Sequence, residues 1–193
     1  MTVAADTRIS NGYNIISRNH SKTTKLTNKC VITSAGMVAD VTTLHKHLIF
    51  WVREYEMKFK RTPPLASIAK KLSCTLYSRR FMPYYAFNLL AGVDENGQGV
   101  VFGYDAVGSY GTETYGVQGS GSQLGVPVLD NQFVGHNFIV KTRPQNIEEV
   151  QDICKDVVNS IAERDIYTGD QVEIITVDVN GVRDPIIAPL RKD

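Results

Sequence analysis

The sequence predicts an α+β fold in which two antiparallel sheets stack between outer layers of helices. Strand-like and helix-like stretches follow one another along the 193 residues as sheet, helices, sheet, helices and sheet. Two helices follow each group of strands, so the strict alternation typical of a doubly wound parallel sheet is missing. The long apolar strand over residues 84–93 needs cover on both faces. Two sheets with helices outside them satisfy that requirement.

Periodicity and turn residues define the individual elements. Apolar residues at steps of three and four predict helices, β-branched runs predict strands, and Gly or Pro marks their ends. Asn96-Gly97 and Asn180-Gly181 predict hairpin turns, because these residue types take positive φ easily. In chain order we expect a strand over 30–35 ending at Gly36, helices over 44–59 and 65–76, strands over 84–93 and 99–105, a short helix around 124–129, a helix over 147–161 with Asn146 as its cap, and a strand over 172–179.

Length and composition favour one domain over residues 1–193. The 21 Lys and Arg against 20 Asp and Glu give a charge of +1 and are scattered, so we expect neither a nucleic-acid nor a membrane partner. Cys30, Cys74 and Cys154 are odd in number and lie among apolar residues, which is typical of reduced core thiols in a cytosolic or nuclear protein.

Three apparent motifs have simpler explanations. The glycines of Gly119–Gly125 have the wrong spacing for a dinucleotide fingerprint and are expected to turn a strand into a helix, with Ser120 or Ser122 as its cap. His45 and His47 are two positions apart, so they point to different faces of a helix rather than to one metal. His20 and His136 lack ligand-like neighbours. We therefore expect no metal and no cofactor.

Two segments leave a catalytic reading open. In the opening MTVAADTRIS, Thr2 is either a terminal nucleophile, whose own α-amine serves as the base, or one residue of a short strand. In ERDIYTGD, residues 163–170, a carboxylate, a hydroxyl and a glycine precede a strand. The simpler reading is the end of a helix, with Gly169 in the left-handed conformation and Asp165 paired to a neighbour.

Four segments together resemble the β-type subunits of the eukaryotic 20S proteasome core, in order and in spacing over nearly the whole chain. They are VAADTRIS, SAGMVAD, GSGS and ERDIYTGD. A longer block, LYSRRFMPYYAFNLLAGVDENGQGVVFGYDAVGSY, together with the closing LRKD, is similar to a non-catalytic branch of that family. The resemblance implies the four-layer α-β-β-α sandwich of the N-terminal-nucleophile hydrolases.

The resemblance also implies site residues. Active members begin with a threonine on a strand upstream of the aspartate that matches Asp6, so this chain is expected to lack that first strand, and Thr2 is not the nucleophile. By resemblance, Asp6 matches the aspartate that positions the catalytic lysine, Lys22 matches that lysine, and Gly36 matches the glycine of the oxyanion turn. Ser120, Asp165 and Thr168 match the residues that order the terminal amine and its water, and Thr168 stands where a serine is usual.

The implied function is structural. The chain completes a β ring with other α- and β-type subunits in the cytoplasm and nucleus and serves ubiquitin-dependent protein degradation. Asp105, by sequence a residue of a turn, is implied to line the substrate pocket of the adjoining chymotrypsin-like subunit. The alternative is a threonine-type endopeptidase whose nucleophile lies in an upstream segment. A Gly-Thr junction shortly before Val3 in a longer reading frame would favour that alternative.

Overall fold

The structure is a computed structural model that describes residues 1–133, 144 and 146–190. The chain divides into two compact units. The first unit contains Met1 and residues 23–119 and 177–183, and the second contains residues 2–22, 120–176 and 184–193 so far as they are described. Each unit contains both strands and helices, so the α+β class is confirmed. The single domain over residues 1–193 stays a prediction.

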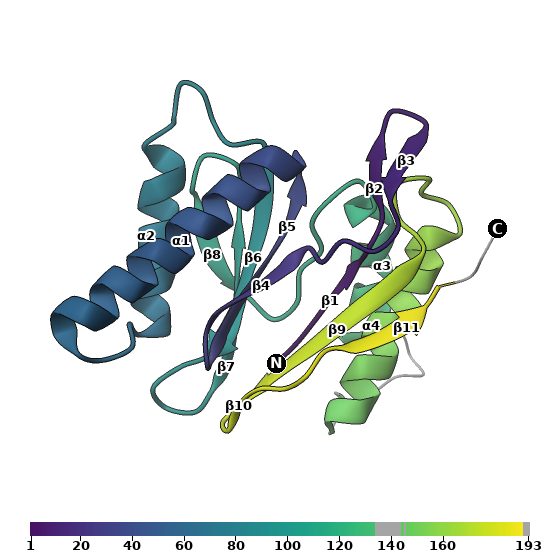
Figure 1. The fold of residues 1–193 in the computed structure, drawn as a ribbon. Helices are drawn as coiled ribbons and strands as arrows, with labels where there is room; N and C mark the ends of the chain where they lie inside the picture. Colours follow the sequence, from purple (N-terminus) through teal and green to yellow (C-terminus); the bar gives the residue numbers. More distant parts are fainter. Residues whose placement is uncertain (134–143, 145, 191–193) are drawn as a thin grey trace. The chain divides into compact units, whose positions relative to one another are not determined.

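The first unit is built on a five-stranded antiparallel sheet (Figure 1). Neighbouring strands are also consecutive in the sequence; short turns connect all of them except the second and third, which are separated in the chain by two helices. Gly97 takes φ +80° in the turn after Val93, as the Asn-Gly pair predicts. The strands, in order across the sheet, are β4 (Thr23–Thr27), β5 (Cys30–Gly36), β6 (Ala86–Val93), β7 (Gly99–Tyr104) and β8 (Tyr110–Glu113).

Helices α1 (Val38–Phe59) and α2 (Leu65–Tyr77) lie against this sheet (Figure 1). The apolar stripe predicted from the sequence faces the sheet: Leu44 and Leu48 of α1 and Leu72 of α2 are completely buried in a core with Ile32 and Leu90. Burial of such side chains contributes about 1.5–3 kcal/mol each. The two helices are therefore held by packing, although neither has a side-chain cap at its start.

A chain of buried polar groups crosses the same core. Ser34 Oγ donates to Asn88 Oδ1 at 2.6 Å, so its single proton is used, and His45 Nε2 at 2.7 Å must donate to it. His45 Nδ1 then accepts from Thr24 Oγ1 at 2.8 Å in the neutral ring. Burial lowers the pKa of His45 from 6.5 to about 4. His47, by contrast, contacts Tyr84 Oη, which confirms that the two histidines use different faces of α1.

The second unit contains β1 (Thr2–Asp6), which pairs antiparallel with β9 (Gln171–Asp178). Strand β11 (Ile186–Pro189) also pairs antiparallel with β9. A separate hairpin joins β2 (Ile9–Asn11) to β3 (Asn14–Ser17). Beyond the second unit, the last two residues of β9 pair with β10 (Gly181–Val182) across the predicted Asn-Gly turn.

Two helices complete the second unit, α3 (Ser122–Phe133) and α4 (Ile147–Ala162). Asn146 caps α4 as expected, since its Oδ1 accepts from the Glu149 N–H at 2.8 Å. Val158 of α4 packs with Val172, Ile174 and Leu190 in a small core between the helix and the sheet. This core holds the end of α4 next to the strand that follows it.

The structure corrects the prediction for one cysteine. Cys30 is buried in the core of the first unit and Cys154 is half-buried on α4, and burial raises the pKa of their thiols to about 12 and about 11. Cys74, however, is exposed on α2, because it lies off the stripe formed by Leu72 and Leu76. The expectation of a core thiol is wrong at that position.

We expect His45 to make the stability of the protein depend on pH. The unfolded chain binds a proton at His45 near pH 6.5, whereas the folded chain binds it only near pH 4. The contribution of His45 to the free energy of unfolding is therefore fully present above pH 6.5. It is lost as the pH falls towards 4, and the loss is on the order of 3 kcal/mol. Urea unfolding at pH 7.0 and 5.0, for the natural protein and His45→Gln, measures this. An equal loss in both proteins between these pH values would contradict it.

Candidate functional site

The first polar cluster of the second unit is centred on the Asp6 carboxylate at the end of β1. Lys22 Nζ donates to Oδ1 at 2.6 Å. The backbone N–H groups of Arg8 and Gly169 donate to Oδ2 at 3.1 and 3.2 Å. The Asp6 and Lys22 side chains are only 12% and 22% exposed. Segments of the chain that are far apart in sequence therefore meet at one largely buried carboxylate.

The second cluster is centred on Asp165, just after the end of α4. Its Oδ2 accepts from Ser120 Oγ at 2.6 Å and from Thr168 Oγ1 at 2.7 Å, and its Oδ1 accepts from the Tyr167 N–H at 3.2 Å. The extra methyl of Thr168 does not prevent the hydroxyl from reaching the carboxylate. The structure thus brings Ser120, Asp165 and Thr168 together, and the Ser120 hydroxyl donates to Asp165.

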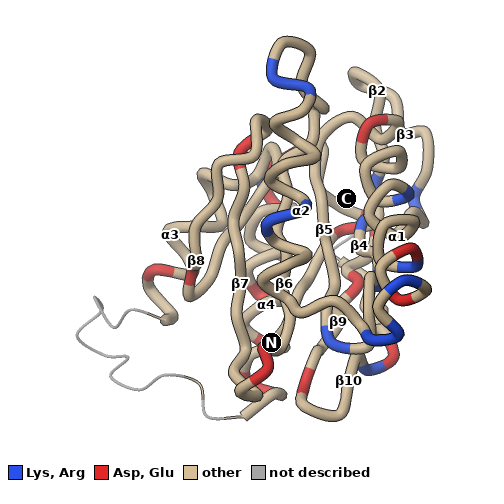
Figure 2. Tube along the Cα trace, turned by 90° about the vertical axis from the view of Figure 1, so that its left-hand side faces the viewer, with Lys and Arg blue, Asp and Glu red and all other residues tan. Residues whose placement is uncertain are grey.

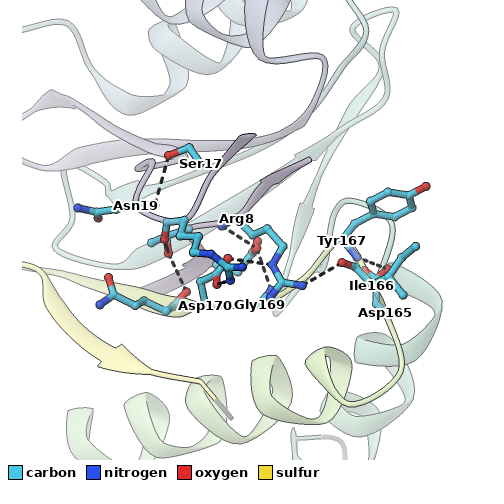
Figure 3. A network of polar contacts seen from close by, with 12 residues as sticks. Arg8, Ser17, Asn19, Asp165, Ile166, Tyr167, Gly169 and Asp170 are labelled. Carbon is cyan, nitrogen blue, oxygen red and sulfur yellow. Dashed lines mark hydrogen bonds and ion pairs between the residues drawn. The ribbon is translucent and has the colours of Figure 1, made fainter. Parts of the chain in front are cut away.

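Arg8 and Asp170 complete the site and were not predicted from the sequence (Figure 3). Arg8 Nε donates to Asp170 Oδ2 at 2.8 Å, and its Nη1 donates to the Ile166 carbonyl at 3.1 Å. Arg18 Nη1 donates to Asp170 Oδ1 at 2.5 Å. Burial alone would raise the pKa of Asp170, but the hydrogen bonds and charges of the two guanidinium groups outweigh it and hold that pKa below its ordinary value.

The backbone of residues 169–170 differs from the simple expectation. The left-handed residue is Asp170, with φ +71°, and not Gly169. Gly169 is required for a different reason: a Cβ at this position would lie 2.5 Å from the guanidinium of Arg8. The glycine therefore makes room for the arginine, and the ion pair with Arg8 and Arg18 accompanies the uncommon conformation of Asp170.

Gly36 and Asp105, the other two predicted residues, belong to the first unit. Gly36 has φ +129°, and a Cβ there would lie 2.3 Å from the Tyr85 carbonyl oxygen, so only glycine fits. Asp105 is exposed at the end of β7, and its Oδ1 accepts from the N–H groups of Val107 and Ser109 at 3.0 and 2.8 Å. This carboxylate organises the turn that leads to β8.

Thr2 lies in β1, opposite Thr176 of β9, which confirms the strand prediction. It is four residues before Asp6 on the same strand, so their Cα atoms are roughly 13 Å apart. A lysine charge fixed beside Asp6 is suited to lowering the pKa of a nearby amine. The Asp165 carboxylate, which binds the hydroxyls of Ser120 and Thr168, is suited to holding such an amine in place. Thr2 lies too far along the strand for the Lys22–Asp6 pair to activate it.

The described part of the chain holds neither a metal-ligand cluster nor a membrane-spanning helix. Within residues 1–133, 144 and 146–190, no three His, Cys, Asp or Glu side chains are grouped so that they could hold a metal ion. Among the helices of those residues, none has the length and apolar character needed to cross a membrane. His136, weighed above as a ligand, lies outside the described residues.

Comparison with known proteins identifies the family of the chain. Residues 1–177 match the family model described as "Proteasome subunit". The chain is 45% identical to a rice protein named proteasome subunit beta type-1, over 99% of this chain and 88% of the relative. The protein of that name from Dictyostelium discoideum is 45% identical over 93% and 78%. An archaeal protein from Pyrobaculum neutrophilum, proteasome subunit beta 2, is 34% identical over 95% and 86%. The chain therefore belongs to the proteasome subunit family.

Proposed function

We propose that the chain is a non-catalytic, structural β-type subunit of the 20S proteasome core particle. The similarity to proteins named proteasome subunit beta type-1, over nearly all of the chain, supports the subunit type. The observation that carries the non-catalytic role is this similarity, because that subunit type is the non-catalytic one of the resembled family. The lysine and carboxylate clusters are fully formed, and Thr2 does not serve them as a nucleophile, since it lies roughly 13 Å from Asp6 along β1.

In this proposal the two units stack as one α-β-β-α sandwich over residues 1–193. The chain completes a β ring with adjoining α- and β-type subunits in the cytoplasm and nucleus and serves ubiquitin-dependent protein degradation. Family membership supports assembly with other subunits. The alternative, a threonine-type endopeptidase subunit, needs a nucleophile on a strand before Thr2, and no observation of the described residues favours it.

An active-site probe tests the non-catalytic role directly. In core particles that contain the full natural chain, a threonine-directed epoxyketone at saturating concentration is expected to modify other subunits and to leave this chain unmodified. Intact-mass spectrometry of the separated subunits measures the modification. The mass increase of a bound epoxyketone on this chain would overturn the proposal and establish the peptidase alternative.

The Asp6 cluster is expected to contribute to stability rather than to catalysis. Asp6→Asn removes the charge that Lys22 and two backbone N–H groups bind, so unfolding should become easier by about 1–3 kcal/mol. Asp178→Asn is the matched control, because its pair with Arg183 is more exposed and should contribute less than the pair of Asp6 with Lys22. Denaturant unfolding of both variants measures the difference.

The peptidase activities of assembled particles distinguish the two roles of this cluster. The peptidase activities, measured per assembled particle, should be unchanged by Asp6→Asn. A loss of activity without any loss of stability would assign the cluster a catalytic role and contradict this prediction.

Asp105 is proposed to act on a neighbour. In this subunit type it would line the substrate pocket of the adjoining chymotrypsin-like subunit, where a carboxylate can accept a hydrogen bond from the bound peptide. Its Oδ1 already holds the turn after β7, so truncation to alanine would disturb the turn as well as the charge. An amide of the same shape separates the two effects, because it keeps an acceptor for Val107 and Ser109.

We therefore expect Asp105→Asn to reduce chymotrypsin-like cleavage about tenfold, equivalent to about 1.4 kcal/mol, while the other activities and assembly stay unchanged. Asp94→Asn is the matched control, since Asp94 Oδ1 holds the preceding turn in the same way, accepting from the Asn96 and Gln98 N–H groups. Fluorogenic peptide assays on purified particles measure this. Equal effects of the two variants, or none from Asp105→Asn, would leave Asp105 as a turn residue only.

A further inference from the structure

One continuous part of the first unit is strongly basic. Residues 57–93 contain no Asp or Glu, although the whole chain carries only +1. The expectation that charges are scattered is therefore wrong here. In Figure 2 the basic positions mark α2 and the connection that leads from α2 towards β6. The cationic residues of the segment are Lys58, Lys60, Arg61, Lys70, Lys71, Arg79 and Arg80.

The connection between α2 and β6 also exposes large apolar side chains. Phe81 is 100% exposed, Met82 83% and Tyr77 63%. Leaving such side chains in water forgoes the free energy that their burial would release. Residues 77–85, which we call the α2–β6 connection, therefore combine unburied apolar surface with the positive charge of Arg79 and Arg80.

The backbone of the α2–β6 connection is held in place. The N–H groups of Arg79, Arg80 and Met82 donate to the carbonyls of Leu76, Tyr77 and Arg79 at 3.0–3.1 Å.

Two further contacts hold the connection. The backbone N–H of Tyr85 donates to Asp40 Oδ2 of α1 at 2.8 Å. The Arg79 guanidinium lies 4.2 Å from the ring centroid of the buried Tyr84. Phe81 is thus presented on an organised turn, which lowers the entropy cost of binding through it.

We propose that the α2–β6 connection docks an acidic protein surface, with Phe81 as the apolar anchor and Arg80 as the partner of a carboxylate. Aromatic residues, Met and Arg are enriched in the centres of protein interfaces, and they make up most of this exposed stretch. The α2–β6 connection carries Arg79 and Arg80 and neither Asp nor Glu, which selects an acidic partner, because like charges would repel. This inference rests on the proposed function, since the acidic surface then belongs to an adjoining subunit of the particle.

Photo-cross-linking in the assembled particle identifies the partner surface. The full chain with Phe81→p-benzoylphenylalanine is incorporated into core particles, irradiated and analysed by mass spectrometry. We expect a cross-link to one other subunit, at a segment that carries Asp or Glu. A cross-link to a segment without carboxylates, a nuclease-sensitive cross-link to nucleic acid, or no cross-link would overturn the proposal.

Competition for incorporation tests the two named side chains. A tagged variant and the natural chain are expressed at equal levels, and their ratio in purified particles is measured. Phe81→Ala and Arg80→Glu should each be under-represented about tenfold, and Arg80→Lys less so. Lys46→Glu, an exposed charge reversal on α1 outside the segment, is the control and should compete equally.

The outcomes separate this proposal from the one on which it rests. Both substituted positions are exposed, so unfolding of the variants should match that of the natural chain. If the natural chain does not enter the particle, the proposed function fails. If it enters and Phe81→Ala and Arg80→Glu compete as well as Lys46→Glu, only the docking surface is overturned.

Discussion

The Asp6 carboxylate is the interaction on which the polar site depends. A carboxylate that is 12% exposed must receive hydrogen bonds on most of its lone pairs, and here it receives them from Lys22, from the turn after β1 and from the Gly169 N–H. These donors come from segments separated by as many as 163 residues. By binding Gly169, Asp6 fixes the start of the segment that leads into β9. The positions of Thr168 and Asp170 follow from that contact.

The same dependence on hydrogen bonds extends to the rest of the polar site. Arg8 passes over Gly169, where a Cβ would lie 2.5 Å from its guanidinium, and reaches both the Ile166 carbonyl and Asp170. Asp165 in turn holds Ser120 and Thr168. Removing one member would leave a partly buried charge or hydroxyl without its partner, at a cost of about 1–3 kcal/mol. The residues of the polar site therefore stabilise one another.

Elements with a long repeating pattern could be predicted from the sequence, and the remainder could not. Helices α1, α2 and α4 and the hairpin of β6 and β7 were expected because 6–22 residues carry a clear period or an Asn-Gly turn. Strands β2, β3, β4, β8 and β11 have only 3–5 residues, too few for a period, and depend on their partners. The pair of Arg8 with Asp170 spans 162 residues and has no local signal. Resemblance, rather than spacing, placed Ser120 with Asp165.

The polar site around Asp6 and Asp165 and the α2–β6 connection differ in how completely their side chains find partners within the fold. Around Asp6 and Asp165 the carboxylates accept hydrogen bonds from within the fold, a state that adds stability and leaves little free energy for an external ligand. The α2–β6 connection is the reverse, because its backbone is bonded internally while Phe81 and Met82 remain in water. Burying those side chains releases free energy only when another molecule covers them. Free energy for association is therefore available at the α2–β6 connection of the first unit, whereas the hydrogen bonds around Asp6 and Asp165 stabilise the fold of the second unit.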